Sequence, residues 1–188
     1  MSLILGILDS GGAAAGAGGS YESIATVTVG SGGSATIDFT SIPSTYTHLQ
    51  VRCIARGTSA NNQINMPFRL NNDTASNYRT HILYSDGSAA ASFDFGSISG
   101  VYLNYMPAAN LASSIFGVAV IDILDYTNTN KTKVFRYLQG MDANGSGNAN
   151  FYSGLWNSTA AINRITFTIA SGNFAQYSHF ALYGIKGA

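Results

Sequence analysis

The side chains best suited to catalysis are three histidines, His48, His81 and His179, which lie far apart in the sequence. The segment Gly96–Gly100 resembles the turn that carries a serine nucleophile, but its central residue is isoleucine. Because serine is abundant, a chance match to a His/Asp/Ser constellation is expected. The sequence therefore predicts that the protein is not an enzyme. A hydrolase assembled in space from these histidines and distant Asp and Ser residues stays as an alternative.

Paired carboxylates and metal ligands are also sparse. Asp122 and Asp125 lie three residues apart in an apolar stretch, so on a strand they point to opposite faces and cannot share one substrate. Asp142–Asn148 has oxygen donors at alternate positions, as in the first half of a calcium loop, but position twelve is Ser153 instead of glutamate. A polar hairpin loop explains the same residues. With one cysteine, Cys53, and three histidines, the sequence predicts no metal site and no cofactor.

An aromatic cluster near the end of the chain offers a different chemistry. Alternation along a strand places Tyr152, Gly154 and Trp156 on one face. If exposed among neutral amides, Tyr152 and Trp156 could stack on a sugar ring, which makes them candidate glycan contacts. Since a lone tryptophan in a β-sandwich usually belongs to the core, the sequence leaves both interpretations open.

The composition favours contact with other proteins over contact with nucleic acid or membrane. The 188 residues carry a formal net charge of +0, and only 10% of them are charged, whereas 46% are hydrophobic. Phosphate binding needs a basic surplus, and a neutral chain gains nothing at an acidic lipid surface. A surface with so few charges is weakly protected from association. We therefore expect a module that packs against other protein in a large assembly; an extracellular β-domain is the alternative.

The first twenty residues differ from the rest and predict an arm, with a β-domain over residues 21–188. The tract Ser10–Ser20 consists mainly of Gly and Ala and predicts a flexible tether. The short apolar run before it has no basic flank and is too short to cross a membrane, so we expect no signal peptide and no membrane helix. The run either grips a partner protein or packs on its own core. Its apolar residues are Leu3, Ile4, Leu5, Ile7 and Leu8.

Beyond the arm, apolar and polar residues alternate with a period of two, which is typical of half-buried strands. About ten short strands without a helical stripe predict an all-β, jelly-roll-like antiparallel β-sandwich. Ile115–Tyr126 is the most apolar strand, and we expect it to be central and covered on both faces. The turn Gly30–Gly33 predicts a hairpin between the strands on either side.

Five stretches together resemble a group of small virion structural proteins of tailed bacteriophages. They begin near the N-terminus and continue to the end of the chain. Packing and turn residues carry the resemblance, which covers almost the whole sequence and includes no catalytic motif. The stretches are the LGIL of residues 5–8 with Tyr21–Val29 beyond the linker, Phe39–Arg52, Ile123–Tyr126, Tyr152–Trp156 and Phe174–Lys186.

The resemblance implies a jelly-roll-like sandwich on the outside of the capsid. It implies a cement, or decoration, protein that binds the major capsid protein as a homo-oligomer, with a trimer favoured, and stabilises the shell. A tail or fibre module that binds a host receptor or glycan is the alternative role. In the first role, the apolar arm residues would bind the partner.

Overall fold

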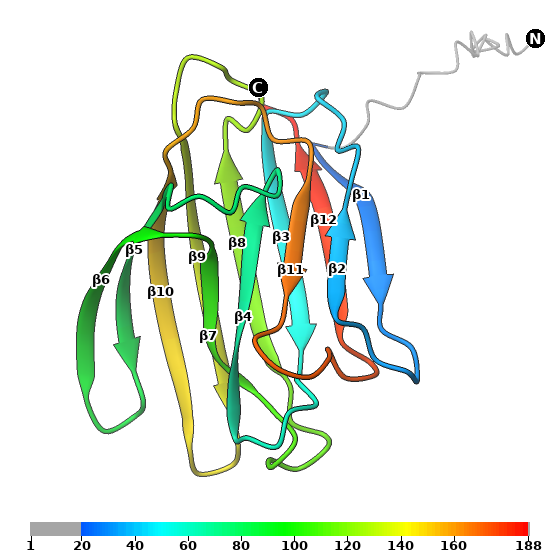
Figure 1. The fold of residues 1–188 in the computed structure, drawn as a ribbon, viewed down its shortest axis with the longest axis vertical. Helices are drawn as coiled ribbons and strands as arrows, with labels where there is room; N and C mark the ends of the chain where they lie inside the picture. The colour runs from blue at the N-terminus through cyan, green and yellow to red at the C-terminus, as the bar shows by residue number, and fades with distance from the viewer. Residues whose placement is uncertain (1–19, 188) are drawn as a thin grey trace, which may run out of the picture.

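The computed structural model describes residues 20–187. Within this range the chain forms strands, and no helix there is long and apolar enough to cross a membrane. The strands are β1 (Tyr21–Thr28), β2 (Thr36–Phe39), β3 (His48–Ala55), β4 (Gln63–Leu70), β5 (Tyr78–Ser85), β6 (Ala90–Ile98), β7 (Val101–Pro107), β8 (Gly117–Leu124), β9 (Lys133–Asp142), β10 (Gly147–Trp156), β11 (Ile165–Thr168) and β12 (His179–Ile185). Figure 1 shows them as two layers that run along the long axis.

The strands form an eight-stranded sheet and a four-stranded sheet, both antiparallel. The larger has the order β1-β12-β3-β8-β9-β10-β5-β6, and the smaller has the order β2-β11-β4-β7. Apart from the pair β5–β6 and the run β8–β9–β10, the chain crosses from one sheet to the other at each step. This wrapping sets β1-β12-β3-β8 against β2-β11-β4-β7, which is the double Greek key of a jelly roll. The predicted jelly-roll-like antiparallel β-sandwich is therefore confirmed.

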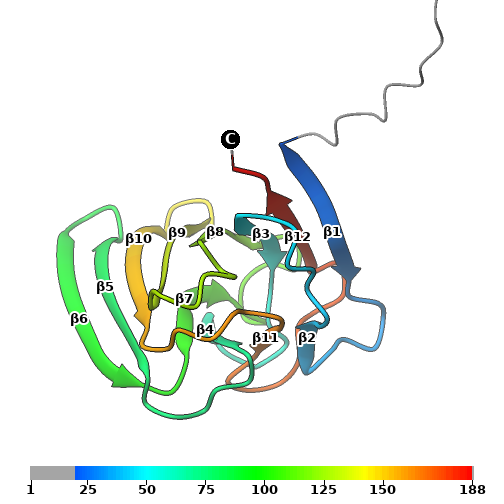
Figure 2. The same ribbon diagram turned by 90° about the horizontal axis from the view of Figure 1, so that it is seen from above.

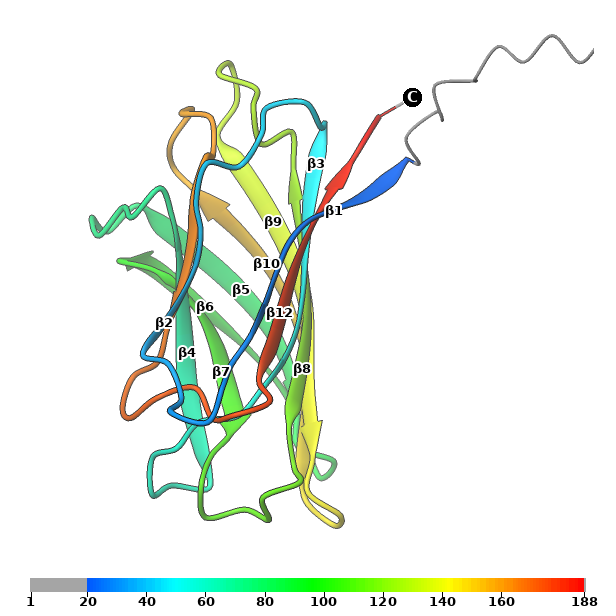
Figure 3. The ribbon, with the colours of Figure 1, turned by 90° about the vertical axis from the view of Figure 1, so that its right-hand side faces the viewer.

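Two hairpins added to this arrangement, β5–β6 and β9–β10, decide the shape of the molecule. They extend the larger sheet past β8, so β5 and β6 reach beyond the four-stranded layer. Figure 2 shows the larger sheet curving around the smaller one, and Figure 3 shows β4 and β8 in opposite layers. The described chain begins and ends at one edge of the larger sheet, where Lys186 N donates to Ser20 O at 2.9 Å.

Aromatic side chains join the two layers. Phe68 of β4 is fully buried, and its ring centroid lies 5.8 Å from that of Phe135 and 6.2 Å from that of Tyr137, both in β9. Within its own layer, Phe68 contacts Phe167 of β11 at 5.4 Å. The inward residues of β9 alternate with exposed ones, as the sequence pattern predicts. The core thus lies between the sheets and leaves the outer face of the larger sheet uncovered.

Three details differ from the sequence-based expectations. β1 and β2 lie in different sheets, so Gly30–Gly33 is a crossover and not a hairpin, because the same turn residues serve both connections. Strand β8 is central, as expected, but its outer face is exposed, with Val118 at 51%. The third difference is β6, which is absent from the expected strands because its residues are small, polar or aromatic without a clean alternation.

Gly154 lies on the inner face of β10, where a substitution tests how closely the core is packed. A Cβ atom on Gly154 would lie 2.0 Å from Cε2 of Phe135, so the Phe135 ring occupies the space of the missing side chain. We expect Gly154→Ala to destabilise the protein by about 2–3 kcal/mol through overpacking, measured by urea unfolding. Gly30→Ala is the matched control, because nothing lies within 4 Å of its added Cβ. Equal stability of the two variants would contradict this packing.

Candidate functional site

The outer face of the eight-stranded sheet carries a continuous group of exposed aliphatic and aromatic side chains. Their exposed fractions range from 38% for Val120 to 61% for Leu138. The group, called the outer apolar patch below, comprises Ile54 of β3, Val118 and Val120 of β8, Leu138 of β9, Phe151 of β10 and Leu83 of β5. Soluble monomers rarely expose a contiguous apolar patch larger than a few hundred Å², so such a face is typical of a contact site for protein.

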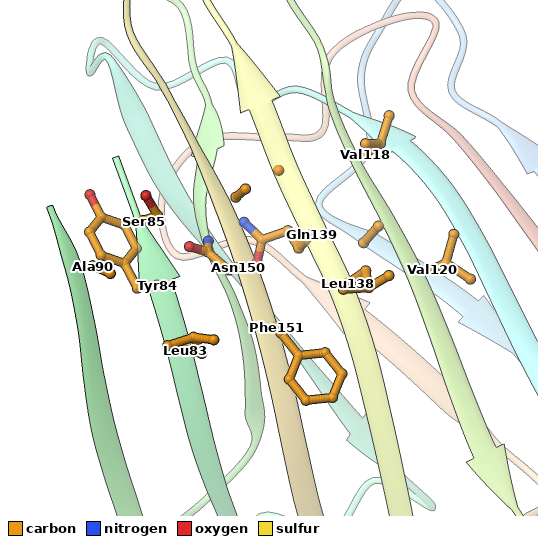
Figure 4. Close-up of a pocket in the computed structure, with 13 residues that line it drawn as sticks. Leu83, Tyr84, Ser85, Ala90, Val118, Val120, Leu138, Gln139, Asn150 and Phe151 are labelled. Carbon is orange, nitrogen blue, oxygen red and sulfur yellow. The ribbon is translucent and has the colours of Figure 1, made fainter. Parts of the chain in front are cut away.

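Strand register brings the patch together from five strands. Val120 pairs with Leu138, Leu138 with Phe151, and Phe151 with Leu83, so four apolar side chains form one row across the sheet. In the adjacent row, Gly140 and Ala149 pair between Val118 and Ser85. Their small size leaves a hollow of about 510 Å³ bordered by the larger side chains. Figure 4 shows Leu83, Phe151, Leu138 and Val120 arranged across the neighbouring strands.

A polar row bounds the patch on one side. Asp122 lies at its centre, where it accepts a hydrogen bond from Gln50 Nε2 at 2.7 Å and from Arg136 Nε at 3.3 Å. Arg52 Nε donates to Gln50 Oε1 at 2.9 Å, and its guanidinium lies 5.3 Å from the centre of the Tyr21 ring. Arg52 itself pairs with Val120, so it lies at the β3 end of the apolar row and reaches back to the polar row through Gln50. The apolar surface therefore has a defined border.

The three histidines lie on this same face but do not converge. His48 Nδ1 accepts a hydrogen bond from Asp125 N at 3.0 Å, and His179 Nδ1 lies 2.9 Å from Thr28 Oγ1. His48 lies at the start of β3 and pairs with Ile185 of β12, whereas His179 lies at the start of β12 and pairs with Ile54 of β3. The two histidines are therefore at opposite ends of this strand pair. His81 is on β5, four strands from β3. The histidines thus occupy three separate positions on an open sheet.

One row places serine, histidine and aspartate side by side. Ser153 pairs with His81, and His81 pairs with Asp94, whose Oδ1 lies 3.8 Å from His81 Nε2. Both ionisable side chains are more than half exposed. No hydrogen bond joins Ser153 to His81 within residues 20–187. The row thus lies on an exposed sheet face and not in the water-excluded site in which an oxyanion is best stabilised.

The prediction that Tyr152 and Trp156 contact a glycan is wrong for this structure. Tyr152 has 0% and Trp156 has 3% of its surface exposed. Tyr152 stacks on Tyr137 with ring centroids 4.0 Å apart, and Trp156 lies parallel to Tyr78. The inferred shared face is correct, but it is the inner face of β10. These aromatics therefore belong to the core, which was the alternative interpretation.

Asp73 anchors Trp156 and gives a pH-dependent prediction. Burial opposes ionisation of Asp73, but hydrogen bonds from Asn77 Nδ2, Trp156 Nε1 at 2.7 Å and Ala75 N outweigh it and lower the pKa of the carboxyl. Its contribution is therefore present above the unfolded-state pKa of about 4 and is lost as the pH falls through the folded-state pKa.

We expect Asp73→Asn to lower the free energy of unfolding by about 1–2 kcal/mol at pH 7. The difference from the native protein should shrink below about pH 4, where the native carboxyl takes up a proton. Urea unfolding across a pH range of about 2.5–7 measures this. A difference that stays constant over that range would contradict the role of the ionised carboxylate.

The remaining sequence candidates have structural roles. Asp142–Asn148 forms the β9–β10 turn, in which Asn144 N donates to Asp142 Oδ1 at 2.7 Å. No group of three or more His, Cys, Asp or Glu side chains within residues 20–187 could hold a metal ion. Cys53 is buried, and desolvation raises the pKa of its thiol to about 12. The apolar arm residues Leu3, Ile4, Leu5, Ile7 and Leu8 lie outside the described residues.

A smaller groove lies where β5 and β6 extend beyond β7. It has a volume of about 180 Å³ and is lined by Asn65, Thr80, Phe95, Ile98, Tyr102 and Asn104. Phe95 is 41% exposed and lies 6.4 Å, centroid to centroid, from Phe93, which is 47% exposed. The lining combines aromatic and apolar surface with neutral amide and hydroxyl groups. The sequence does not predict this groove, because β6 is not among the strands that its pattern indicates.

The outer apolar patch is not predicted from the sequence either. Alternation identifies Val118 and Val120 as one face of a strand and Ala119 and Ile121 as the other, but both faces are apolar. A strand of this kind is normally covered on both sides, so the pattern indicated burial. Detecting the patch requires the sheet order, which brings apolar outward positions of five strands together.

The comparisons with known proteins identify no family. The chain matches no protein-family model. No curated protein is significantly similar to it. Among solved structures, the chain is similar to the galectin LEC-6 of Caenorhabditis elegans, with 8% sequence identity and a TM-score of 0.32. That comparison covers 86% of this chain and 96% of the galectin.

Proposed function

We propose that the chain is a non-enzymatic virion structural protein that decorates the capsid exterior of a tailed bacteriophage. In this role it binds the major capsid protein as a homo-oligomer, with a trimer favoured, and strengthens the shell as cement. The observation that carries the proposal is the outer apolar patch. Covering exposed apolar area of this kind with another protein surface removes it from water, which favours association.

Three further features support this function. The jelly roll with its aromatic core provides a rigid module. The low charge content leaves association unopposed by electrostatic repulsion. The resemblance to small phage structural proteins extends along almost the whole sequence. Repetition over many capsid sites makes a modest affinity per copy sufficient, because simultaneous contacts reinforce one another.

A sedimentation assay with capsids that lack the protein tests this proposal. We expect the purified full chain to sediment with the capsids saturably and to raise the temperature at which they rupture. Matched reactions without capsids control for aggregation. No binding to capsids, together with binding to host cells or isolated tails, would overturn the proposal.

The groove beside β6 favours a second candidate, a tail or fibre module that binds a host glycan. Phe95 could stack on a sugar ring while Asn65 and Asn104 supply hydrogen bonds, and no charged side chain lines the groove. On this account, Phe95→Ala abolishes binding to a host-surface glycan array and leaves the melting temperature nearly unchanged. Asp94→Ala, in the same strand on the opposite face, is the control. Equal array binding by the native chain and Phe95→Ala would exclude this groove as the glycan site.

A further inference from the structure

Within residues 20–187, the two sheets end in four edge strands, β1 and β6 of the larger sheet and β2 and β7 of the smaller one. Three of them are protected against pairing with another strand. β1 is interrupted by a register shift after Ser23 and carries the ion pair of Glu22 with Lys186 at 2.7 Å. β2 has only four residues. β7 ends in a proline, and the Tyr102 carbonyl already accepts a hydrogen bond from Tyr137 Oη at 2.8 Å.

The edge of β6 lacks these protections. Its nine residues include no Pro, Lys or Arg, and Ala90–Phe95 pairs with β5 without a register shift. Asp86 N donates to Ala89 O at the start of this hairpin, and hydrogen-bonded pairs alternate along an antiparallel ladder. Ser92 and Asp94 therefore direct their backbone N–H and C=O groups to the open edge. Such a row of groups is a template for a further strand.

We propose that β6 binds an extended segment of another protein as an additional strand of the larger sheet, and that this segment has a basic residue between apolar ones. The inference rests on the proposed function, since the segment would belong to the major capsid protein. It adds a second contact next to the outer apolar patch, because Ser92 of β6 pairs with Leu83 at the end of the patch.

Phe93 and Phe95 select apolar side chains on the added strand. They pair with Ile82 and Thr80, whose side chains are buried, so both rings lie on the inner face of the larger sheet. Because β6 reaches beyond the four-stranded layer (Figure 2), the rings remain 47% and 41% exposed. An added strand places every second side chain beside them. Apolar residues at those positions remove ring surface from water.

Asp94 selects a basic residue between the apolar ones. Its side chain lies on the opposite face of β6 and is half exposed, with Oδ1 3.8 Å from His81 Nε2. None of the ion pairs that Lys and Arg form within residues 20–187 includes Asp94. A Lys or Arg directly across from Asp94 on the added strand is attracted, whereas an Asp or Glu there is repelled. The carboxylate therefore makes the edge selective.

The sequence of this chain favours a different protein as the source of the segment. A basic residue between two apolar ones occurs at Val51–Cys53, Phe68–Leu70 and Phe135–Tyr137. These triplets lie in β3, β4 and β9, each of which is paired on both sides. Residues 1–19 contain no Lys or Arg. A second copy of β6 brings another Asp94 and no basic residue.

Fluorescence anisotropy with two labelled peptides tests the inference on the full chain. The probes are TVTVKVTVT, which is as long as β6, and TVTVEVTVT, which replaces its lysine with glutamate. Ser92→Pro removes an N–H from the open edge without removing one from the ladder to β5, and Ser92→Ala is the matched control that keeps this N–H. We expect Ser92→Pro to weaken binding of the lysine peptide at least about tenfold and Ser92→Ala to change it less than about twofold.

A charge exchange tests the selectivity of the same edge. We expect the native chain to prefer the lysine peptide by about three- to tenfold, and Asp94→Lys to prefer the glutamate peptide. Thermal unfolding checks that each variant is folded. If Ser92→Pro does not fold, the exchange of preference decides the matter, because Asp94 is exposed and its substitution leaves the backbone unchanged.

Three results would overturn the inference. They are no binding of either peptide by the native chain, equal binding by Ser92→Pro and Ser92→Ala, or a peptide preference that Asp94→Lys leaves unchanged. Self-association of the native chain that Ser92→Pro abolishes, measured by analytical ultracentrifugation without peptide, would overturn the assignment to a different protein. Because no capsid is present, peptide binding can fail while capsid sedimentation succeeds, and the reverse, so the two proposals are tested separately.

Discussion

Phe68→Ala is expected to lower the free energy of unfolding by about 4 kcal/mol, because it empties a buried site that joins the two sheets. Phe68 has no exposed surface and contacts Phe135, Tyr137 and Phe167. The loss combines the transfer free energy of the ring with the cost of the cavity that remains. Chemical unfolding followed by circular dichroism measures it.

Phe151→Ala is the matched control, since it makes the same substitution on the outer face of the larger sheet. Phe151 is 44% exposed, so we expect a cost below about 1.5 kcal/mol. If the core lies only between the sheets, Phe68→Ala lowers the free energy of unfolding more than Phe151→Ala does. Comparable losses would show that the outer face of an isolated copy is already covered, and would contradict an open patch.

Leu138→Lys is expected to weaken association by about 10- to 100-fold while leaving the fold intact. Leu138 is 61% exposed and lies in the central row of the patch, so a lysine there meets solvent in an isolated copy. In a covered patch, the same substitution removes the transfer free energy of one leucine and requires an ammonium group to be desolvated. Analytical ultracentrifugation and capsid sedimentation measure the loss, and thermal unfolding checks the fold.

Ser92→Lys separates the effect of position from the effect of charge. Ser92 lies in the same cross-strand row, next to Leu83 and beyond the aliphatic residues. It adds the same charge to the same face, and we expect association to change less than about twofold. If Ser92→Lys weakens association as much as Leu138→Lys, general electrostatic repulsion is responsible and the patch is not the contact surface.

The sequence predicts most strands, because period-two alternation reports directly on half-buried strands. Strand β9 illustrates this, with every second residue from Lys133 to Met141 buried. Sheet order is harder, because Gly30–Gly33 contains the same turn residues whether the chain returns within a sheet or crosses between sheets. The β6 strand lies at a sheet edge and has little apolar alternation, so local pattern alone could not identify it.

The candidate site depends on long-range pairing, which limits what local patterns can reveal. Trp156 and Tyr152 were correctly grouped on one face, but only the sheet order shows that this face is the core. Val120, Leu138 and Phe151 lie on three strands, and their register makes them one row. Apolar residues that the sequence assigns to burial are in fact divided between the core and an open surface.

We propose that this module covers the outside of a capsid through protein contacts. Immunogold electron microscopy of particles from the source lysate tests it most directly, using antibody against the purified domain. If the protein decorates the capsid, label should spread over the whole head. Label confined to the tail tip or fibres would contradict it and favour the groove beside β6 as the functional surface, and particles without any label would contradict both roles.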